Sequence, residues 1–255
     1  MTVTHDGLDL SWLGYATARV EAPDGTVVYT DPGRYGVLDG TWAEQYGGVD
    51  HPSGDAYDAR DGDVVLVTHD HHYSDEGVDR VAASDATVVV YEDVDADRIT
   101  EGGRPVDSPE SLRDDVRRVG YDETVTVDGV AVTAVPAYNH PDGPRADENG
   151  TVAHPEGFGC GFHFEVAGVP CLWTGDSDVV PEQEALDVSV LFPSIAQSFT
   201  MDRHEAADLA EALSPTLVLP IHYNTFPGLE ADSGAFAADV AKRGVPVVLD
   251  ESGDL

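Results

Sequence analysis

An apolar run over residues 63–68 leads directly into three histidines, and this junction constrains the fold more than any other feature of the sequence. The histidines are His69, His71 and His72. Histidines two residues apart in a turn can direct both imidazoles at one cation, because a divalent metal binds neutral ring nitrogens that converge on it. The junction therefore predicts a buried strand whose end carries a metal site.

Three other predicted strands also end close to a potential metal ligand. The residues that share this position are His140, Asp176 and His222. Each is a weak indication alone, but sites in α/β proteins form where strand ends converge. We therefore expect all three side chains to share one site with the histidine cluster.

The rest of the pattern predicts an α/β protein. Asp-Gly turns join alternating strands into hairpins, and later strands alternate with helices, the last strand being expected over residues 245–249. The clearest helix, over residues 202–213, begins with Asp202 and Glu205 in the positions of a capping box. Strand-rich halves with attached helices favour a four-layer αββα sandwich, although periodicity alone would also fit a doubly wound sheet. The length suits a single domain over residues 1–255.

The two cysteines, Cys160 and Cys171, are expected to be buried thiols rather than a disulfide. A hairpin over residues 159–174 with a two-residue turn would place Phe164 opposite Cys171. Cys160 then lies about 13 Å further along its strand, too far away for a disulfide bond.

The charge of the chain is strongly one-sided, with 49 acidic residues against 13 basic ones and a net charge of −36. The acids are spread along the whole sequence, and Lys242 is the only lysine. A uniformly acidic surface with a single lysine indicates solubility in molar salt, so we expect a cytoplasmic protein of an extreme halophile. Nucleic-acid binding needs a basic surface, and no apolar run is long enough for a bilayer span. We expect a small-molecule substrate and neither a nucleic-acid nor a membrane partner; a homo-oligomer stays open.

Seven short motifs follow one another along the chain: WLGYA at 12–16, TDP at 30–32, HDH at 69–71, AYNH at 137–140, TGDS at 174–177, FTM at 199–201 and PIHY at 220–223. In this order they resemble those of the metallo-β-lactamase superfamily. Within it the sequence is most similar to the branch that contains L-ascorbate-6-phosphate lactonase and related metal-dependent hydrolases. The ordered set is more specific than any single motif.

This resemblance implies the αββα fold and a set of roles for the site residues. His69, His71 and His140 would bind one metal ion, Asp176 could bridge two ions, and His222 would serve the second. Asp31 would lie beneath the site and orient the ligating imidazoles, as second ligand shells do.

The chain departs from the family pattern just after the second histidine. The family has an aspartate and then a histidine where this chain has Tyr73 and Ser74. Two alternatives follow: His72 and Asp75 take over as catalytic or metal-binding groups, or both are solvent-exposed and the second metal site is lost. One or two divalent ions are therefore expected, with zinc or manganese suited to imidazole and carboxylate ligands.

Arg34, Arg145 and His154 are candidates for substrate binding. Arg34 lies two residues past the TDP motif at 30–32. Arg145 and His154 lie in a long loop over residues 139–157 that is rich in proline and glycine. Arginines bind phosphate or carboxylate groups. The alternative, which we favour for the two arginines, is that they pair with nearby acids.

These features favour hydrolysis of a small metabolite, a lactone, ester or phosphoester that can be anionic, by water activated on the metal. No serine triad or nucleotide-binding motif competes with this hypothesis. Two alternatives are a non-catalytic relative with a degenerate second metal site and, less favoured because of the acidic surface, a nuclease.

Overall fold

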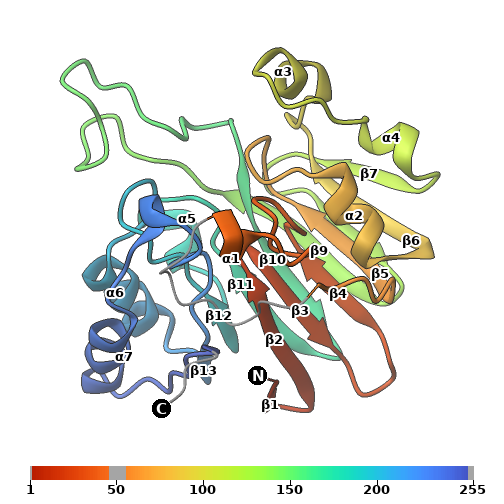
Figure 1. The fold of residues 1–255 in the computed structure, drawn as a ribbon. Coiled ribbons are helices and arrows are strands. Elements are labelled where there is room, and N and C mark those ends of the chain that lie inside the picture. The colour runs from red at the N-terminus through yellow and green to blue at the C-terminus, as the bar shows by residue number, and fades with distance from the viewer. Residues whose placement is uncertain (1, 46–55, 252–255) are drawn as a thin grey trace.

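Seven strands from the first half of the chain form one sheet, in the order in which they occur in the sequence (Figure 1). This computed structural model describes residues 2–45 and 56–251. The strands are β1 (Val3–His5), β2 (Leu8–Gly14), β3 (Thr17–Glu21), β4 (Val27–Thr30), β5 (Gly62–Val67), β6 (Ala82–Tyr91) and β7 (Val116–Val119). Because β4 and β5 are parallel, Asp31 and Thr68, which follow them, lie at the same edge of the sheet.

Six strands form the second sheet, in the order β13-β12-β11-β10-β9-β8. They are β8 (Thr124–Val127), β9 (Val130–Pro136), β10 (Cys160–Val166), β11 (Val169–Trp173), β12 (Val190–Phe192) and β13 (Leu217–Val218). The strands β11, β12 and β13 are parallel. Their ends therefore meet at one edge, where Asp176 follows β11 and His222 follows β13. The strand expected over residues 245–249 is only a single bridge, between Val218 and Val247.

Helices cover the outer faces of the two sheets, which confirms the expected αββα sandwich. In Figure 1, α2 and α4 lie beside the first sheet, and α6 and α7 lie beside the second. The helices are α1 (Trp42–Gln45), α2 (Asp75–Val81), α3 (Ala96–Glu101), α4 (Pro109–Leu112), α5 (Pro181–Glu184), α6 (Arg203–Leu213) and α7 (Ser233–Lys242), with a 3-10 turn η1 (Pro227–Leu229). The capping box of Asp202 and Glu205 begins α6 as predicted. No helix in the described residues has the length and apolar character to cross a membrane.

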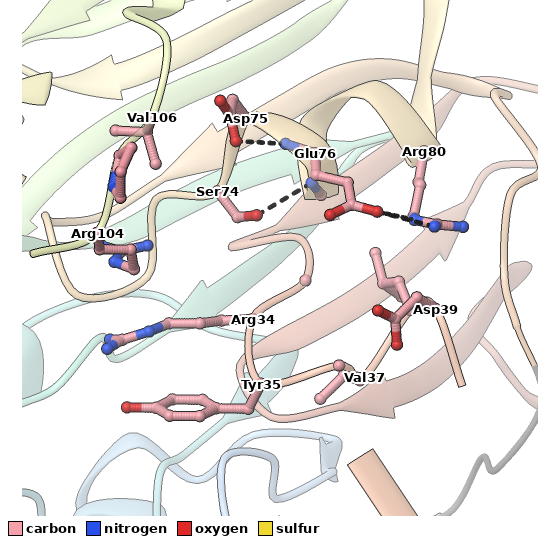
Figure 2. A pocket seen from close by; sticks show the side chains of 15 residues that line it. Arg34, Tyr35, Val37, Asp39, Ser74, Asp75, Glu76, Arg80, Arg104 and Val106 are labelled. Carbon is pink, nitrogen blue, oxygen red and sulfur yellow. Dashed lines mark hydrogen bonds and ion pairs between the residues drawn. The ribbon is translucent and has the colours of Figure 1, made fainter. Parts of the chain in front are cut away.

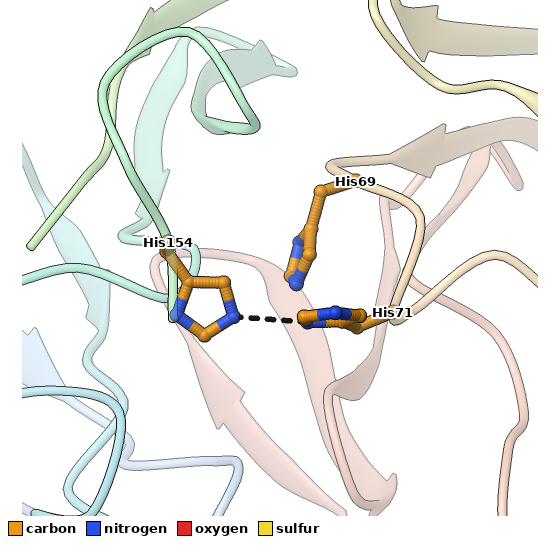
Figure 3. A group of neighbouring side chains, drawn as sticks. All are labelled: His69, His71 and His154. Atoms are coloured by element: carbon orange, nitrogen blue, oxygen red, sulfur yellow. Dashed lines mark hydrogen bonds between the residues drawn. The ribbon is translucent and has the colours of Figure 1, made fainter. Parts of the chain in front are cut away.

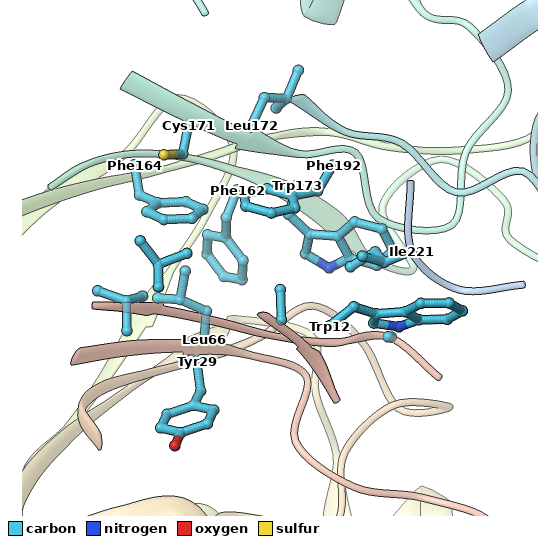
Figure 4. Packing of buried hydrophobic residues seen from close by; sticks show 14 of the residues in the cluster. Trp12, Tyr29, Leu66, Phe162, Phe164, Cys171, Leu172, Trp173, Phe192 and Ile221 are labelled. Carbon is cyan, nitrogen blue, oxygen red and sulfur yellow. The ribbon is translucent and has the colours of Figure 1, made fainter. Parts of the chain in front are cut away.

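Large apolar side chains from both sheets meet in the core (Figure 4). Phe162 and Phe164 of β10 are fully buried, whereas the alternating residue Glu165 is exposed, as expected for a strand with one face on the core. Burial of each such side chain contributes about 1.5–3 kcal/mol. The register pairs Phe164 with Cys171, as predicted, and both cysteines are buried and free. This core holds the ligand-bearing edges of the two sheets together.

Candidate metal centre

The three histidines after β5 lie in a tight turn between that strand and α2. The backbone N–H groups of His72 and Tyr73 both donate to the carbonyl of His69, at 3.1 Å in each case. Ser74 then caps α2 by accepting a hydrogen bond from the backbone N–H of Gly77. The turn leaves His69 and His72 buried and His71 exposed.

One group of potential ligands consists of His69, His71 and His154, whose ligand atoms lie within 4.8 Å of one another. Figure 3 shows these rings converging from two loops that are far apart in the sequence. His71 Nδ1 and His154 Nε2 are 3.2 Å apart. Asp176 adjoins this group, with its Oδ2 at 3.4 Å from His154 Nε2 and at 3.7 Å from His69 Nε2.

A second group lies on the other side of Asp176 and contains His72 and His222. The Nε2 atoms of these two rings are 2.9 Å apart. Asp176 Oδ2 lies 3.5 Å from His72 Nε2, and Asp176 Oδ1 lies 3.6 Å from His222 Nε2. Asp176 therefore stands between the two groups: its Oδ2 lies close to rings of both, and its Oδ1 lies close to His222.

Two buried atoms in this cluster have no hydrogen-bond partner among the described residues: His69 Nε2 and Asp176 Oδ1. A buried polar atom without a partner costs about 1–3 kcal/mol, so such atoms mark a place where something else binds. Imidazole nitrogen and carboxylate oxygen are the donors that zinc and manganese accept. The residues present therefore fit one or two divalent metal ions.

The buried imidazoles are also in the neutral form that metal binding requires. Burial lowers the pKa of His154 and of His222 to about 3, and it lowers the pKa of His69 and His72 as well. These rings are neutral near pH 7, which is the state that binds a metal. Burial instead raises the pKa of Asp176, the nearby charge of Asp31 raises it further, and the charge of Arg34 offsets this only in part.

Asp31 lies beneath the cluster and holds part of it by hydrogen bonds. Its Oδ2 lies 2.9 Å from His72 Nδ1 and accepts from the indole N–H of Trp173 at 2.7 Å, and its Oδ1 accepts from the backbone of Thr68 at 2.8 Å. Burial raises the pKa of Asp31 to about 7. Its φ of 37° is left-handed, which turns the chain at the end of β4. The contact with His72 fits the orienting role expected from the sequence.

His140 does not join the cluster, and this corrects the prediction that it is a ligand. Its ring Nε2 lies 3.1 Å from the Val179 carbonyl, and its backbone N–H donates to Asp178. The loop leaves the site at this point and returns at His154, because the N–H of Asn139 donates to the His154 carbonyl at 2.8 Å. His154, expected only near a substrate, takes the place predicted for His140.

Asp75 also lies outside the cluster, whereas its neighbour His72 lies inside. One Asp75 oxygen accepts from the backbone of Glu76 and the other from the backbone of Asp107, both at 2.8 Å. Tyr73 is buried, and its hydroxyl donates to the Asp107 carbonyl. Of the two candidates for the altered motif, only His72 therefore faces the site, and Asp75 supports α2.

Arg145 is not placed to bind a substrate, which corrects a second expectation. Its guanidinium is buried and donates to Asp178 at 2.9 Å, to the Glu205 carboxylate and to the Thr200 carbonyl. It fastens the loop over residues 139–157 to the start of α6, so the alternative of pairing with nearby acids holds.

A cavity of about 240 Å³ opens over Asp176 and His222. Arg34 lines it, and its guanidinium donates to the His71 carbonyl and pairs with no carboxylate among the described residues, so the favoured expectation that Arg34 pairs with a nearby acid is wrong. The expectation that Arg34 binds a substrate stays a prediction. The other lining side chains are mostly aromatic or apolar, among them Tyr15, Tyr35, Phe199, Phe226 and Leu229. A small molecule in this cavity would contact both the polar cluster and an apolar wall.

Comparisons with known proteins agree with this architecture. Residues 9–222 match the family described as the beta-lactamase superfamily domain. The chain is 31% identical over 229 residues to a UPF0173 metal-dependent hydrolase of Anaeromyxobacter dehalogenans, covering 87% of this chain and 76% of that protein. A UPF0173 metal-dependent hydrolase of Methanopyrus kandleri is 30% identical, over 96% of this chain and 97% of that protein.

A solved structure shares the fold as well. It is a metallo hydrolase from the archaeon Ignicoccus hospitalis, with a TM-score of 0.65 and 21% identity, covering 97% of this chain and 96% of that one. The αββα sandwich is therefore a metallo-β-lactamase fold. The match over residues 9–222, together with relatives named as metal-dependent hydrolases, shows that this chain belongs to the beta-lactamase superfamily domain family.

Proposed function

We propose that this protein hydrolyses a lactone, ester or phosphoester bond in a small, anionic metabolite. One observation carries the proposal: imidazoles and a carboxylate converge beneath a cavity, and two of their buried atoms have no partner among the described residues. Relatives named metal-dependent hydrolases support hydrolysis, and the resemblance of the sequence motifs to those of the lactonase-containing branch favours this type of bond. The net charge of −36 supports a small-molecule substrate over a nucleic acid.

Two divalent ions, of zinc or manganese, would be held by this chain's own residues. His69, His71 and His154 would hold the first, His72 and His222 the second, and Asp176 would serve both. When bound, such an ion lowers the pKa of water and polarises a carbonyl or phosphoryl oxygen. Asp31 would keep the His72 ring oriented through its Nδ1 atom.

The cavity wall supports the same function. Tyr15 packs against both His72 and His222, with ring centroids 4.9 and 4.6 Å away. Burial raises the pKa of Tyr15, so its hydroxyl stays protonated near neutral pH. Tyr35 and Phe226 pack against each other beside it, with their tilted rings 4.7 Å apart between centroids. This aromatic wall keeps bulk water away from the face of the metal cluster on which a substrate would lie.

The test is the metal content of the full chain, purified without chelator and measured by elemental mass spectrometry. Variants His154→Ala and His140→Ala are measured beside it, together with hydrolysis of a panel of lactones, aryl esters and aryl phosphates. We expect about two equivalents of metal in the wild type and in His140→Ala, and loss of metal and of hydrolysis in His154→Ala.

The other outcomes decide between the alternatives. About one equivalent would restrict the metal to a single group of ligands. Bound metal without hydrolysis of any panel member would favour a non-catalytic relative. Absence of metal even after reconstitution with zinc and manganese would overturn the proposal.

A further inference from the structure

Two arginines differ from every other basic side chain in the described residues. In this acid-rich chain, the remaining arginines and Lys242 each form an ion pair with at least one carboxylate. Within the same described residues, Arg34 and Arg104 pair with no carboxylate and donate only to backbone carbonyls. With 49 acids against 13 bases, an arginine without an acid is an exception that needs an explanation.

Both arginines hold the turn that carries the histidines. Arg34 donates to the His71 carbonyl, and Arg104 donates to the carbonyls of Asp70 and Tyr73. A guanidinium has five N–H donors, so each side chain keeps donors that these contacts do not use. Burial and the nearby charge of Arg34 together lower the pKa of Arg104, which shows that the two cations lie close enough to repel each other.

The two guanidiniums face open space beside the metal cluster. Both line a cleft of about 270 Å³ whose wall also includes His71 and Phe158. Arg34 and His71 line the cavity over Asp176 as well, so the cleft adjoins that cavity. Asp70 borders the cleft, but its carboxylate already accepts from Arg98 at 2.6 Å and from the Asp95 backbone at 2.9 Å.

A second pocket, of about 220 Å³, lies beside α2 and is also lined by Arg34 and Arg104 (Figure 2). In that view Arg34 and Arg104 lie at one end of the pocket, away from Glu76 and Arg80, which bond to each other. Of the acids that line this pocket, Glu76 pairs with Arg80, Asp39 accepts from Thr41, and Asp75 accepts from the backbone of Glu76 and Asp107. None of them forms an ion pair with Arg34 or Arg104 among the described residues, so the positive charge of the two arginines is not neutralised there.

We propose that Arg34 and Arg104 form a binding site for an anionic oxygen group, a phosphate or a carboxylate, on the part of the substrate that is not hydrolysed. The proposal rests on the proposed function for the identity of the bond that reacts, but binding of the anion can be measured without catalysis. Two adjacent cations suit two oxygens of one anion, because guanidinium forks bind such groups in a bidentate way.

The strongly negative net charge of the protein makes a locally positive site useful for attracting an anionic substrate. A net charge of −36 repels anionic metabolites from most of the molecule, more so at low salt. A local pair of uncompensated arginines next to the metal cluster would provide an attractive position for such a molecule. It would also fix one end of the substrate while the other end reaches Asp176.

The experiment measures binding of inorganic phosphate and of acetate to the metal-loaded full chain by calorimetry, at one fixed KCl concentration. Variants Arg34→Gln and Arg104→Gln are compared with Arg80→Gln, a control that removes the same charge from a pocket shared with both arginines but from a side chain paired with Glu76. We expect each test variant to weaken phosphate binding by about ten-fold or more, and the control to leave it unchanged. Stronger binding of acetate than of phosphate would assign the site to carboxylates.

Two controls separate this proposal from its alternatives. Repeating the titration after chelation of the metal removes the contribution of phosphate bound to metal. The metal content of Arg104→Gln shows whether this substitution acts only by loosening the turn that carries the histidines. Arg104→Lys retains the charge if the glutamine variant does not fold. Undiminished phosphate binding in both folded test variants, or no phosphate binding by the wild type, would overturn the proposal. Anion binding without any hydrolysis would leave it standing while the proposed function fails.

Discussion

Two polar clusters each include a residue of the loop over residues 139–157, and they are built on opposite principles. The metal cluster consists of His69, His71, His72, His154, Asp176 and His222, and the Arg145 cluster of Arg145, Asp178, Thr200 and Glu205. In the Arg145 cluster the guanidinium donates to two carboxylates and a carbonyl. In the metal cluster, His69 Nε2 and Asp176 Oδ1 lack a hydrogen-bond partner among the described residues.

The difference separates stability from function. A buried charge that is fully paired holds two parts of the chain together, and removing one partner leaves the other uncompensated. Buried polar atoms that converge but lack hydrogen-bond partners instead destabilise the protein when no ligand is bound. Such atoms are retained where a bound ligand supplies the missing partner. Substitutions in each cluster should therefore change different measured quantities.

The largest effect is expected from His69→Ala. The ligand atom of His69 lies within 4.8 Å of those of His71 and His154, and also of those of His72 and Asp176, so its loss removes a donor that borders both groups. We expect metal content after dialysis to fall to background, and any hydrolytic activity to fall with it, by more than about 1,000-fold. The control is His163→Ala, a histidine on the outer side of β10 whose ring bonds to the Asp187 carbonyl. Full metal content in His69→Ala would break the distinction between the clusters.

Arg145→Ala should lower the free energy of unfolding by about 3–5 kcal/mol, because Asp178 would remain buried without its cation. Denaturant titration of the metal-loaded protein measures the loss. Arg117→Ala, which removes an exposed pair with Asp115, is the control and should change stability by less than about 1 kcal/mol. Equal losses in the two variants would show that the Arg145 cluster does not hold the loop.

Asp31→Asn should weaken metal binding by about 10–100-fold while leaving the ligands in place. The amide cannot accept from Trp173, Thr68 and His72 as the carboxylate does. Competition with a chromogenic chelator measures the affinity, and Asp75→Asn, whose contacts lie in α2 and with Asp107, serves as the control. An unchanged affinity would mean that the His72 ring needs no support from Asp31.

The smallest effect is expected from His140→Ala, although the sequence placed this residue among the ligands. Its ring touches the Val179 carbonyl and the ring of Tyr138, so we expect unchanged metal content and a stability loss of no more than about 1.5 kcal/mol. Elemental analysis and thermal unfolding check both. Loss of metal from this variant would restore His140 to the site and would contradict the assignment of His154.

The elements of the fold followed from local patterns. Alternation in β10 and the two-residue turn after it gave the correct pairing of Phe164 with Cys171, because register in a hairpin is set within a few residues. The capping box of α6 was equally local. The segment over residues 245–249 forms a single bridge rather than the expected strand, because β13 is only two residues long and bonds to this segment only at Val218.

In the site, the sequence by itself determined those candidates that directly follow buried strands. His69, Asp176 and His222 lie at strand ends, and the direction of parallel strands carries such residues to one edge. The choice between His140 and His154, and between His72 and Asp75, was decided only by the tertiary structure. The loop after Asn139 is held in its return to the site by Arg145, which binds Glu205, 60 residues away. The His72 ring faces inward because its two nitrogens contact Asp31 and His222. Such contacts join residues distant in sequence, so no local pattern of residues encodes them.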